Sequence, residues 1–340
     1  MRKLLVATSM LAVGILLAAG IIRASSPNPT PAQLAQAESI MKRVAASGAK
    51  NTYSAVGKTT IIYRGRPVTS EIKMYHEKPD KCRIEYYKSP LHGLIVGNIG
   101  KQAWRFDPKL RKVVKIESSG CIKNNCDMGL LVKNYRVEPA GNANIAGRPA
   151  HSLIIKSKSG QIRKNLWADS KTFVVLRSED YDTHGARQSS TEFKSIKYVN
   201  DLPDTLFHCP KNTSQVTRQE YGKTMSLADL SKRVGFQVRT PKYLPGGYKL
   251  DGYRLYRCPH KCGGMSAYIR YTNGMNSISV FELIDSDCRC CGSHNSDAGM
   301  CIEQGGSAEH SATFTSGGKR FVIIADTTRA ELEKIARSLR

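Results

Sequence analysis

The feature that most constrains the fold is a series of strand-like runs joined by short turns. Between residues 151 and 199 the runs HSLIIKS, RKNLWAD, TFVVLRSEDYD and TEFKSIKYV are separated by turn sequences such as SKSG and THGA. Parallel neighbours need a crossover of a dozen or more residues, so links this short demand antiparallel pairing. Similar runs, among them VTSEIKMYH, KCRIEYY and RKVVKIE, precede this region. The sequence therefore predicts a large antiparallel sheet.

An amphipathic helix is predicted in front of these strands. Thr30 is a suitable N-cap, Pro31 occupies the first helical position, and Gly48 ends the pattern. Between them the apolar stripe consists of Leu34, Ala37, Met41 and Val44. A helix followed by an antiparallel sheet gives the first domain, residues 28–205, an α+β fold.

A second, smaller α+β domain is predicted for residues 225–340, after a linker at 206–224 where the strand pattern weakens. Its strands are MSAYIRYTNG, SISVFELID and KRFVIIADT, and it begins and ends with helices. Ser226 with Asp229 caps the first helix, and Thr328 with Glu331 caps the second. The apolar stripe of the last helix contains Leu332, Ile335 and Leu339.

The first 24 residues resemble a secretory signal. Arg2 and Lys3 precede an apolar run from Leu4 to Ile22, and small residues follow. We predict that residues 1–24 are a signal peptide, with an uncleaved N-terminal anchor as the alternative. Either reading places the remaining chain outside the cytoplasm, in the periplasm or at the outer face of the cytoplasmic membrane.

The chain is strongly basic, with 52 Lys and Arg against 28 Asp and Glu and a net charge of +24. Without the three basic residues of the signal, 49 remain and the net charge is +21. Such a charge usually raises the question of nucleic acid. An exported chain without a dense basic run is a poor nucleic-acid binder, so we expect none. An anionic membrane surface or an acidic partner segment fits better, and a basic surface without a specific partner is the simplest alternative.

No enzymatic chemistry is predicted. The sequence lacks a P-loop, a Rossmann glycine fingerprint, HExxH and GxSxG, and its eight histidines are scattered. The adjacent acids Glu179 and Asp180 lie on a strand run and therefore point to opposite faces. We predict no catalytic residue, no cofactor and no bound metal.

Ten cysteines fall into one set of four and one of six. In an exported protein, even sets within domains favour disulfides. CIKNNC could close a small loop on itself, which would leave Cys82 to pair with Cys209. The cluster at 258–301, with His294, also supplies ligands for Zn or Cu(I), so a metal-binding or thiol-redox protein is an alternative. The disulfide candidates are Cys82, Cys121, Cys126, Cys209, Cys258, Cys262, Cys288, Cys290, Cys291 and Cys301.

Several stretches resemble one family. The segment from Tyr135 to Phe193 is similar to the MucB/RseB proteins, regulators of an envelope-stress sigma factor. The matching motifs are Tyr135-Arg136-Val137, Ala146-Gly147-Arg148-Pro149-Ala150, Leu166-Trp167-Ala168-Asp169 and Leu176-Arg177-Ser178. KPDKCRIEY and WRFDP resemble the wider superfamily of lipoprotein carriers, LolA and LolB. VGFQVRTPKYLPGGYKLDGYRLYR is similar to the start of the small C-terminal domain of the MucB/RseB proteins.

The resemblance implies a curved half-barrel sheet that wraps around helices and leaves a cavity for acyl chains. It also implies a regulator that binds the periplasmic segment of a membrane-bound anti-sigma factor and is released by lipid or lipoprotein. A lipid or lipoprotein carrier is the alternative function. Those relatives are not rich in cysteine, so the role of the 258–301 cluster does not transfer. As cavity-lining residues we predict Ile72, Met74, Trp104 and Phe106, which ordinary core packing would also explain.

Overall fold

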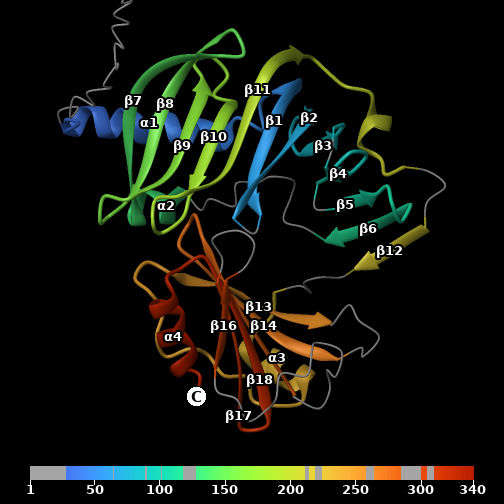
Figure 1. Ribbon diagram of the computed structural model, residues 1–340, viewed down its shortest axis with the longest axis vertical. Coiled ribbons are helices and arrows are strands. Elements are labelled where there is room, and N and C mark those ends of the chain that lie inside the picture. Colours follow the sequence, from blue (N-terminus) through green and yellow to red (C-terminus); the bar gives the residue numbers. More distant parts are fainter. Residues whose placement is uncertain are drawn as a thin grey trace, which may run out of the picture.

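The chain forms two β-sheets, each accompanied by helices, in a computed structural model (Figure 1). The structure describes residues 28–63, 65–88, 90–100, 102–117, 128–210, 214–218, 224–257, 264–284, 300–304 and 310–340. The predicted signal, residues 1–24, lies outside these ranges. Within them, no helix has both the length and the apolar character to cross a membrane.

The large sheet has twelve strands and curves along its length (Figure 1). Neighbouring strands are antiparallel except for one parallel pair, β12 with β6. In spatial order the strands are β12 (Ser214–Arg218), β6 (Lys112–Glu117), β5 (Gln102–Asp107), β4 (Ile95–Ile99), β3 (Lys81–Tyr86), β2 (Arg66–Glu77), β1 (Thr52–Tyr63), β11 (Arg187–Val199), β10 (Val175–Tyr181), β9 (Ile162–Asp169), β8 (Arg148–Ser157) and β7 (Tyr135–Ile145). The predicted α+β fold with a large antiparallel sheet is confirmed.

Among the residues that the structure describes, two α-helices belong to the large sheet. Helix α1 (Pro31–Ala46) crosses one face of β7 to β10 (Figure 1). Its capping box is formed by Thr30 and Gln33, so the predicted start is confirmed. Helix α2 (Met128–Asn134) was not predicted. Together they bury a core against β7, β8 and β9 that contains Ala37, Met41, Val44, Leu131, Val137, Leu153, Ile155 and Leu166.

The region predicted as a linker contributes to the large sheet. A short 3-10 helix, η1 (Asp204–Phe207), packs on β3 and β4, and β12 lies between residues 206 and 224. The Phe207 side chain is fully buried. Because β12 pairs with β6 in parallel, the sheet is not a pure antiparallel meander. A five-residue strand is too short to give a clear periodic signal.

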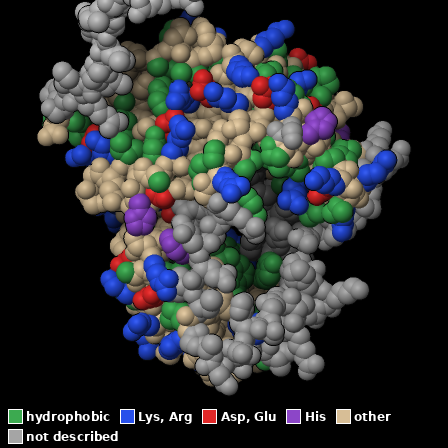
Figure 2. Space-filling model, viewed as in Figure 1, with side chains coloured by type: hydrophobic (Ala, Val, Ile, Leu, Met, Phe, Trp, Pro, Cys, Tyr) green, Lys and Arg blue, Asp and Glu red, His purple; other side chains and the backbone are tan. Residues whose placement is uncertain are grey.

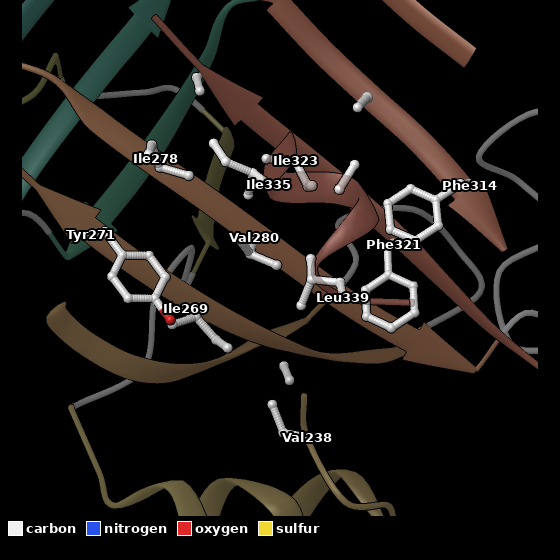
Figure 3. Close-up of a cluster of buried hydrophobic side chains, with 14 of the residues drawn as sticks. Val238, Ile269, Tyr271, Ile278, Val280, Phe314, Phe321, Ile323, Ile335 and Leu339 are labelled. Carbon is white, nitrogen blue, oxygen red and sulfur yellow. The ribbon is translucent and has the colours of Figure 1, made fainter. Parts of the chain in front are cut away.

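Within the described ranges, the small sheet has six antiparallel strands, and two helices accompany it. Its spatial order is β13 (Lys249–Arg257), β14 (Met265–Thr272), β15 (Ser277–Ile284), β18 (Lys319–Ala325), β17 (His310–Ser316) and β16 (Cys301–Gln304). Helices α3 (Leu227–Val234) and α4 (Arg329–Arg337) pack on it, capped by Ser226 and Thr328 as predicted. Figure 3 shows its core, where Ile335 and Leu339 meet Ile323, Phe314 and Phe321.

Candidate ligand cavity and the contact between the sheets

A cavity of about 620 Å³ lies between α1, the large sheet and the β14–β15 turn of the small sheet. Most of its wall is apolar, and every element that surrounds it contributes side chains. The apolar lining residues include Met41, Val44, Tyr53, Ile72, Met74, Ile84, Leu131, Ile155, Leu166, Phe193 and Met275. A cavity of this size and composition suits a flexible apolar molecule such as an acyl chain.

The structure brings together two of the four predicted cavity residues. Ile72 and Met74 alternate along β2 and both line the cavity. Trp104 and Phe106, on β5, do not line it. Trp104 is buried, and its Nε1 donates a hydrogen bond to the Phe207 carbonyl oxygen over 3.0 Å. This hydrogen bond holds η1 in place. The alternation of residues along a strand does not reveal such a contact.

The turn between β14 and β15 docks the small sheet onto the large one. The Asn273 side-chain amide donates to the Tyr135 hydroxyl over 2.8 Å, and both groups are buried. The Asn134 amide, at the end of α2, donates to the carbonyl oxygens of Asn273 and Gly247, each over 2.9 Å. Met275 packs against the core under α1. One turn of the small sheet is thus both a cavity wall and an interface.

Gly274 permits this close approach. Its φ is +96°, and a Cβ atom there would lie 2.5 Å from the Leu131 backbone nitrogen. Both the left-handed conformation and the contact with α2 therefore favour glycine. The sequence NGMN at 273–276 indicates only a turn, so the sequence did not predict an interface there.

A partly buried ion pair also joins the two sheets inside the cavity. Arg163, on β9, donates from Nη2 to Oδ2 of Asp326, which follows β18, over 2.9 Å. Both residues line the cavity. The Arg163 side chain is only 5% exposed. Burial raises the pKa of Asp326, and the Arg163 charge opposes that rise.

His76 joins the segment that follows α1 to the cavity wall. Its Nε2 lies 2.8 Å from the Gly48 carbonyl oxygen, and its ring lies 5.3 Å from that of Tyr53. Burial lowers the pKa of His76 below its ordinary value. The uncharged imidazole therefore completes a largely apolar wall.

The described cysteines belong mainly to the large sheet. Cys82 is buried, lines the cavity and is disulfide-bonded. Cys209 is half-buried and is not the disulfide partner of Cys82, so the Cys82–Cys209 bridge raised by the sequence is not formed. Cys301 begins β16, but its side chain is not described. Cys121, Cys126, Cys258, Cys262, Cys288, Cys290 and Cys291 lie outside the described residues, and so does the candidate metal ligand His294.

The basic charge is spread over the surface. On the face in Figure 2, Lys and Arg side chains occur over both sheets and alternate with acidic ones. Several basic residues of the chain are in ion pairs, such as Lys194 with Glu71 and Lys156 with Glu138. A dispersed positive surface supports attraction to anionic partners without defining a site.

One family model matches part of the chain. Residues 112–210 match the family described as the MucB/RseB N-terminal domain. No curated protein matches the sequence. The resemblance to the MucB/RseB proteins inferred from the sequence motifs is thus confirmed.

Solved structures of MucB have a similar fold. The complex of MucA and MucB from Pseudomonas aeruginosa is 17% identical, with a TM-score of 0.63, covering 90% of this chain and 98% of that one. A crystal structure of MucB in complex with MucA(peri) is 16% identical, with a TM-score of 0.62, and covers 89% and 98%. MucB alone is 16% identical, with a TM-score of 0.54, covering 89% and 97%. At these identities the likeness establishes the fold of both sheets.

Proposed function

We propose that this chain, which carries a MucB/RseB N-terminal domain, is a non-enzymatic regulator that binds the periplasmic segment of a membrane-bound anti-sigma factor. The observation that carries the proposal is the fold shared with MucB in its complex with MucA, over 90% of this chain. In this view the protein acts outside the cytoplasm, in envelope-stress signalling. The 28–205 and 225–340 domains would cooperate, and the small one would contact the partner.

The cavity supports a second part of the proposal, that a lipid-like ligand modulates partner binding. Its wall consists of residues from α1, from strands of the large sheet and from the β14–β15 turn of the small sheet. A ligand inside would therefore touch both domains. An acyl chain gains about 0.8 kcal/mol for each CH₂ group that it buries. A chain of moderate length would therefore bind without any specific polar contact.

Isothermal titration calorimetry tests the regulator. The periplasmic segment of an anti-sigma factor from the organism that encodes this chain is titrated into the full chain. We expect saturable binding that weakens when the protein is loaded with a phospholipid. Absence of binding to that segment, with the chain folded by circular dichroism, would reject the regulatory function.

A lipid or lipoprotein carrier is the second candidate, because a cavity of this kind also suits transport. A carrier would transfer a fluorescent phospholipid between two vesicle populations without the anti-sigma segment. Regulation instead predicts ligand-dependent release of the segment and slow transfer. The metal-binding or thiol-redox alternative depends on residues outside the described ranges, and metal analysis of the exported protein tests it.

A further inference from the structure

The ion pair inside the cavity carries an inference about how the ligand is recognised. We propose that Arg163 binds the anionic head group of the cavity ligand, and that Asp326 competes with that head group for the same guanidinium. Ligand binding would thus weaken the hold of the large sheet on the small one. This inference rests on the proposed ligand-binding function of the cavity.

The first observation is that Arg163 is buried but incompletely bonded. A guanidinium has five N–H donors and remains charged inside a protein. The described hydrogen bond of Arg163 is the one from Nη2 to Asp326. Its Nη1 is buried and, among the described residues, has no hydrogen-bond partner. Because an unsatisfied buried donor is costly, a ligand that accepts from Nη1 would gain more than an ordinary hydrogen bond.

The second observation is that Asp326 is a weak partner for this cation. It accepts through Oδ2, while its buried Oδ1 has no hydrogen-bond partner among the described residues. The contact is therefore single rather than the stronger bidentate arrangement. Two other groups affect the pKa of Asp326. The negative charge of Asp182 raises it, and His310 lowers it. Burial already favours protonation of Asp326, which lowers the cost of releasing it from Arg163.

The third observation is the chemistry around the pair. Ile155 and Met275 supply apolar surface in the same cavity. An apolar wall beside a guanidinium whose Nη1 has no hydrogen-bond partner among the described residues fits an amphiphile with an acyl chain and an anionic head. A phosphate, sulfate or carboxylate could accept from both Nη1 and Nη2, which one Asp326 oxygen does not do.

The position of Asp326 gives ligand binding a consequence for the small sheet. Asp326 lies between β18 and Thr328, the N-cap of α4. Loss of its bond to Arg163 would leave the bonds at the β14–β15 turn and the bond from Asn134 to Gly247 as the described hydrogen bonds between the two sheets and their flanking segments. The coupling is reciprocal. The free energy by which docking of the small sheet weakens ligand binding equals the free energy by which the ligand weakens that docking.

Two variants of the full chain test the competition with two probes of equal chain length, decyl phosphate and decanol. Arg163→Met should weaken decyl phosphate binding about tenfold, because it removes a charged hydrogen-bond donor. Asp326→Asn should strengthen decyl phosphate binding about threefold to tenfold, because it removes the competing charge. Decanol affinity should change little in either. A merely structural role for the pair would instead shift both probes, and both variants, in the same direction.

Hydrogen exchange supplies the second readout and a control. Decyl phosphate should speed exchange of amides at 273–276 and 324–328 in the wild type but not in Arg163→Met. The control is Glu333→Gln, which removes an exposed pair with Arg329 on α4 and should behave as wild type.

The outcomes separate this inference from the proposed function. Equal affinities for decyl phosphate and decanol in all variants would overturn the role of Arg163 while leaving a ligand-binding cavity. Weaker phosphate binding by Asp326→Asn would overturn the competition. Binding of neither probe to the wild type would reject the ligand-binding function itself, and the inference with it.

Discussion

Arg148 and Asp169 form an ion pair between adjacent strands of the large sheet. Arg148 begins β8, Asp169 ends β9, and the Arg148 Nε donates to Oδ2 of Asp169. The Asp169 side chain is 1% exposed, and its Oδ1 accepts the backbone amides of Lys171 and Thr172 over 2.9 Å each. One carboxylate therefore joins two of the family motifs and organises the β9–β10 turn.

This carboxylate predicts a pH dependence of stability. Burial acts to raise the pKa of Asp169, but the bonds from Arg148, Thr172 and Lys171 outweigh it and hold the pKa below its ordinary value. Because the pKa of Asp169 is lower in the folded state, its carboxylate stabilises the fold at pH values above the unfolded-state pKa of about 4. This stabilisation is lost as the pH falls through the folded-state pKa.

The test is Asp169→Asn, measured by urea unfolding at several pH values. At pH 7 the variant should lose about 2 kcal/mol of unfolding free energy, because Arg148 loses its partner. The difference from wild type should shrink steadily below pH 4. Asp201→Asn, at an exposed position, is the control and should cost little. A difference that does not change with pH would contradict the assignment.

The Tyr135 hydroxyl is predicted to stabilise the contact between the sheets. Tyr135→Phe removes one buried hydrogen bond and leaves the Asn273 amide without that acceptor. We expect a loss of about 1–2 kcal/mol. Hydrogen exchange should rise at residues 273–276. Tyr243→Phe, which removes a bond to Glu331 within the small domain, should not affect exchange in that turn.

Gly274 is predicted to tolerate no side chain. Gly274→Ala adds a Cβ atom 2.5 Å from the Leu131 backbone nitrogen, so the turn must move away from α2. Gly318→Ala is the matched control, because its φ is +71° and nothing lies within 4 Å of an added Cβ. Both variants should lose about 1 kcal/mol from the left-handed conformation. Only Gly274→Ala should also separate the sheets, as measured by small-angle X-ray scattering.

Filling the cavity should block the ligand. Ile72→Trp places a larger side chain at a cavity wall, and decanol binding should fall below detection by calorimetry. Overpacking a filled core costs about 1–3 kcal/mol of unfolding free energy. Because the cavity has room for the indole, Ile72→Trp should cost less than that. Phe106→Trp is the control, since Phe106 does not line the cavity. If Ile72→Trp still binds decanol, the decanol site lies outside this cavity.

Local sequence patterns were sufficient for much of the fold. The caps at Thr30, Ser226 and Thr328 lie within three residues of the groups that they bond, so they are visible in the sequence. Strands β8 to β11 were predicted because short turns separate alternating runs. The elements α2, β12, β16 and β17 were missed because their patterns are short. Strands β1 and β7 were missed although they are long, and the pairing of each contains a register shift.

The sequence by itself determined the two α+β units, the antiparallel pairing within the meander and the family resemblance, because these depend on neighbours along the chain. Only the tertiary structure decided which apolar residues line the cavity and which, like Trp104, are packed elsewhere. It also decided that Arg163 meets Asp326, 163 residues away, and that Asn273 meets Tyr135 across 138 residues. Such contacts depend on how two sheets are placed against each other, and that placement leaves no periodic trace in the sequence.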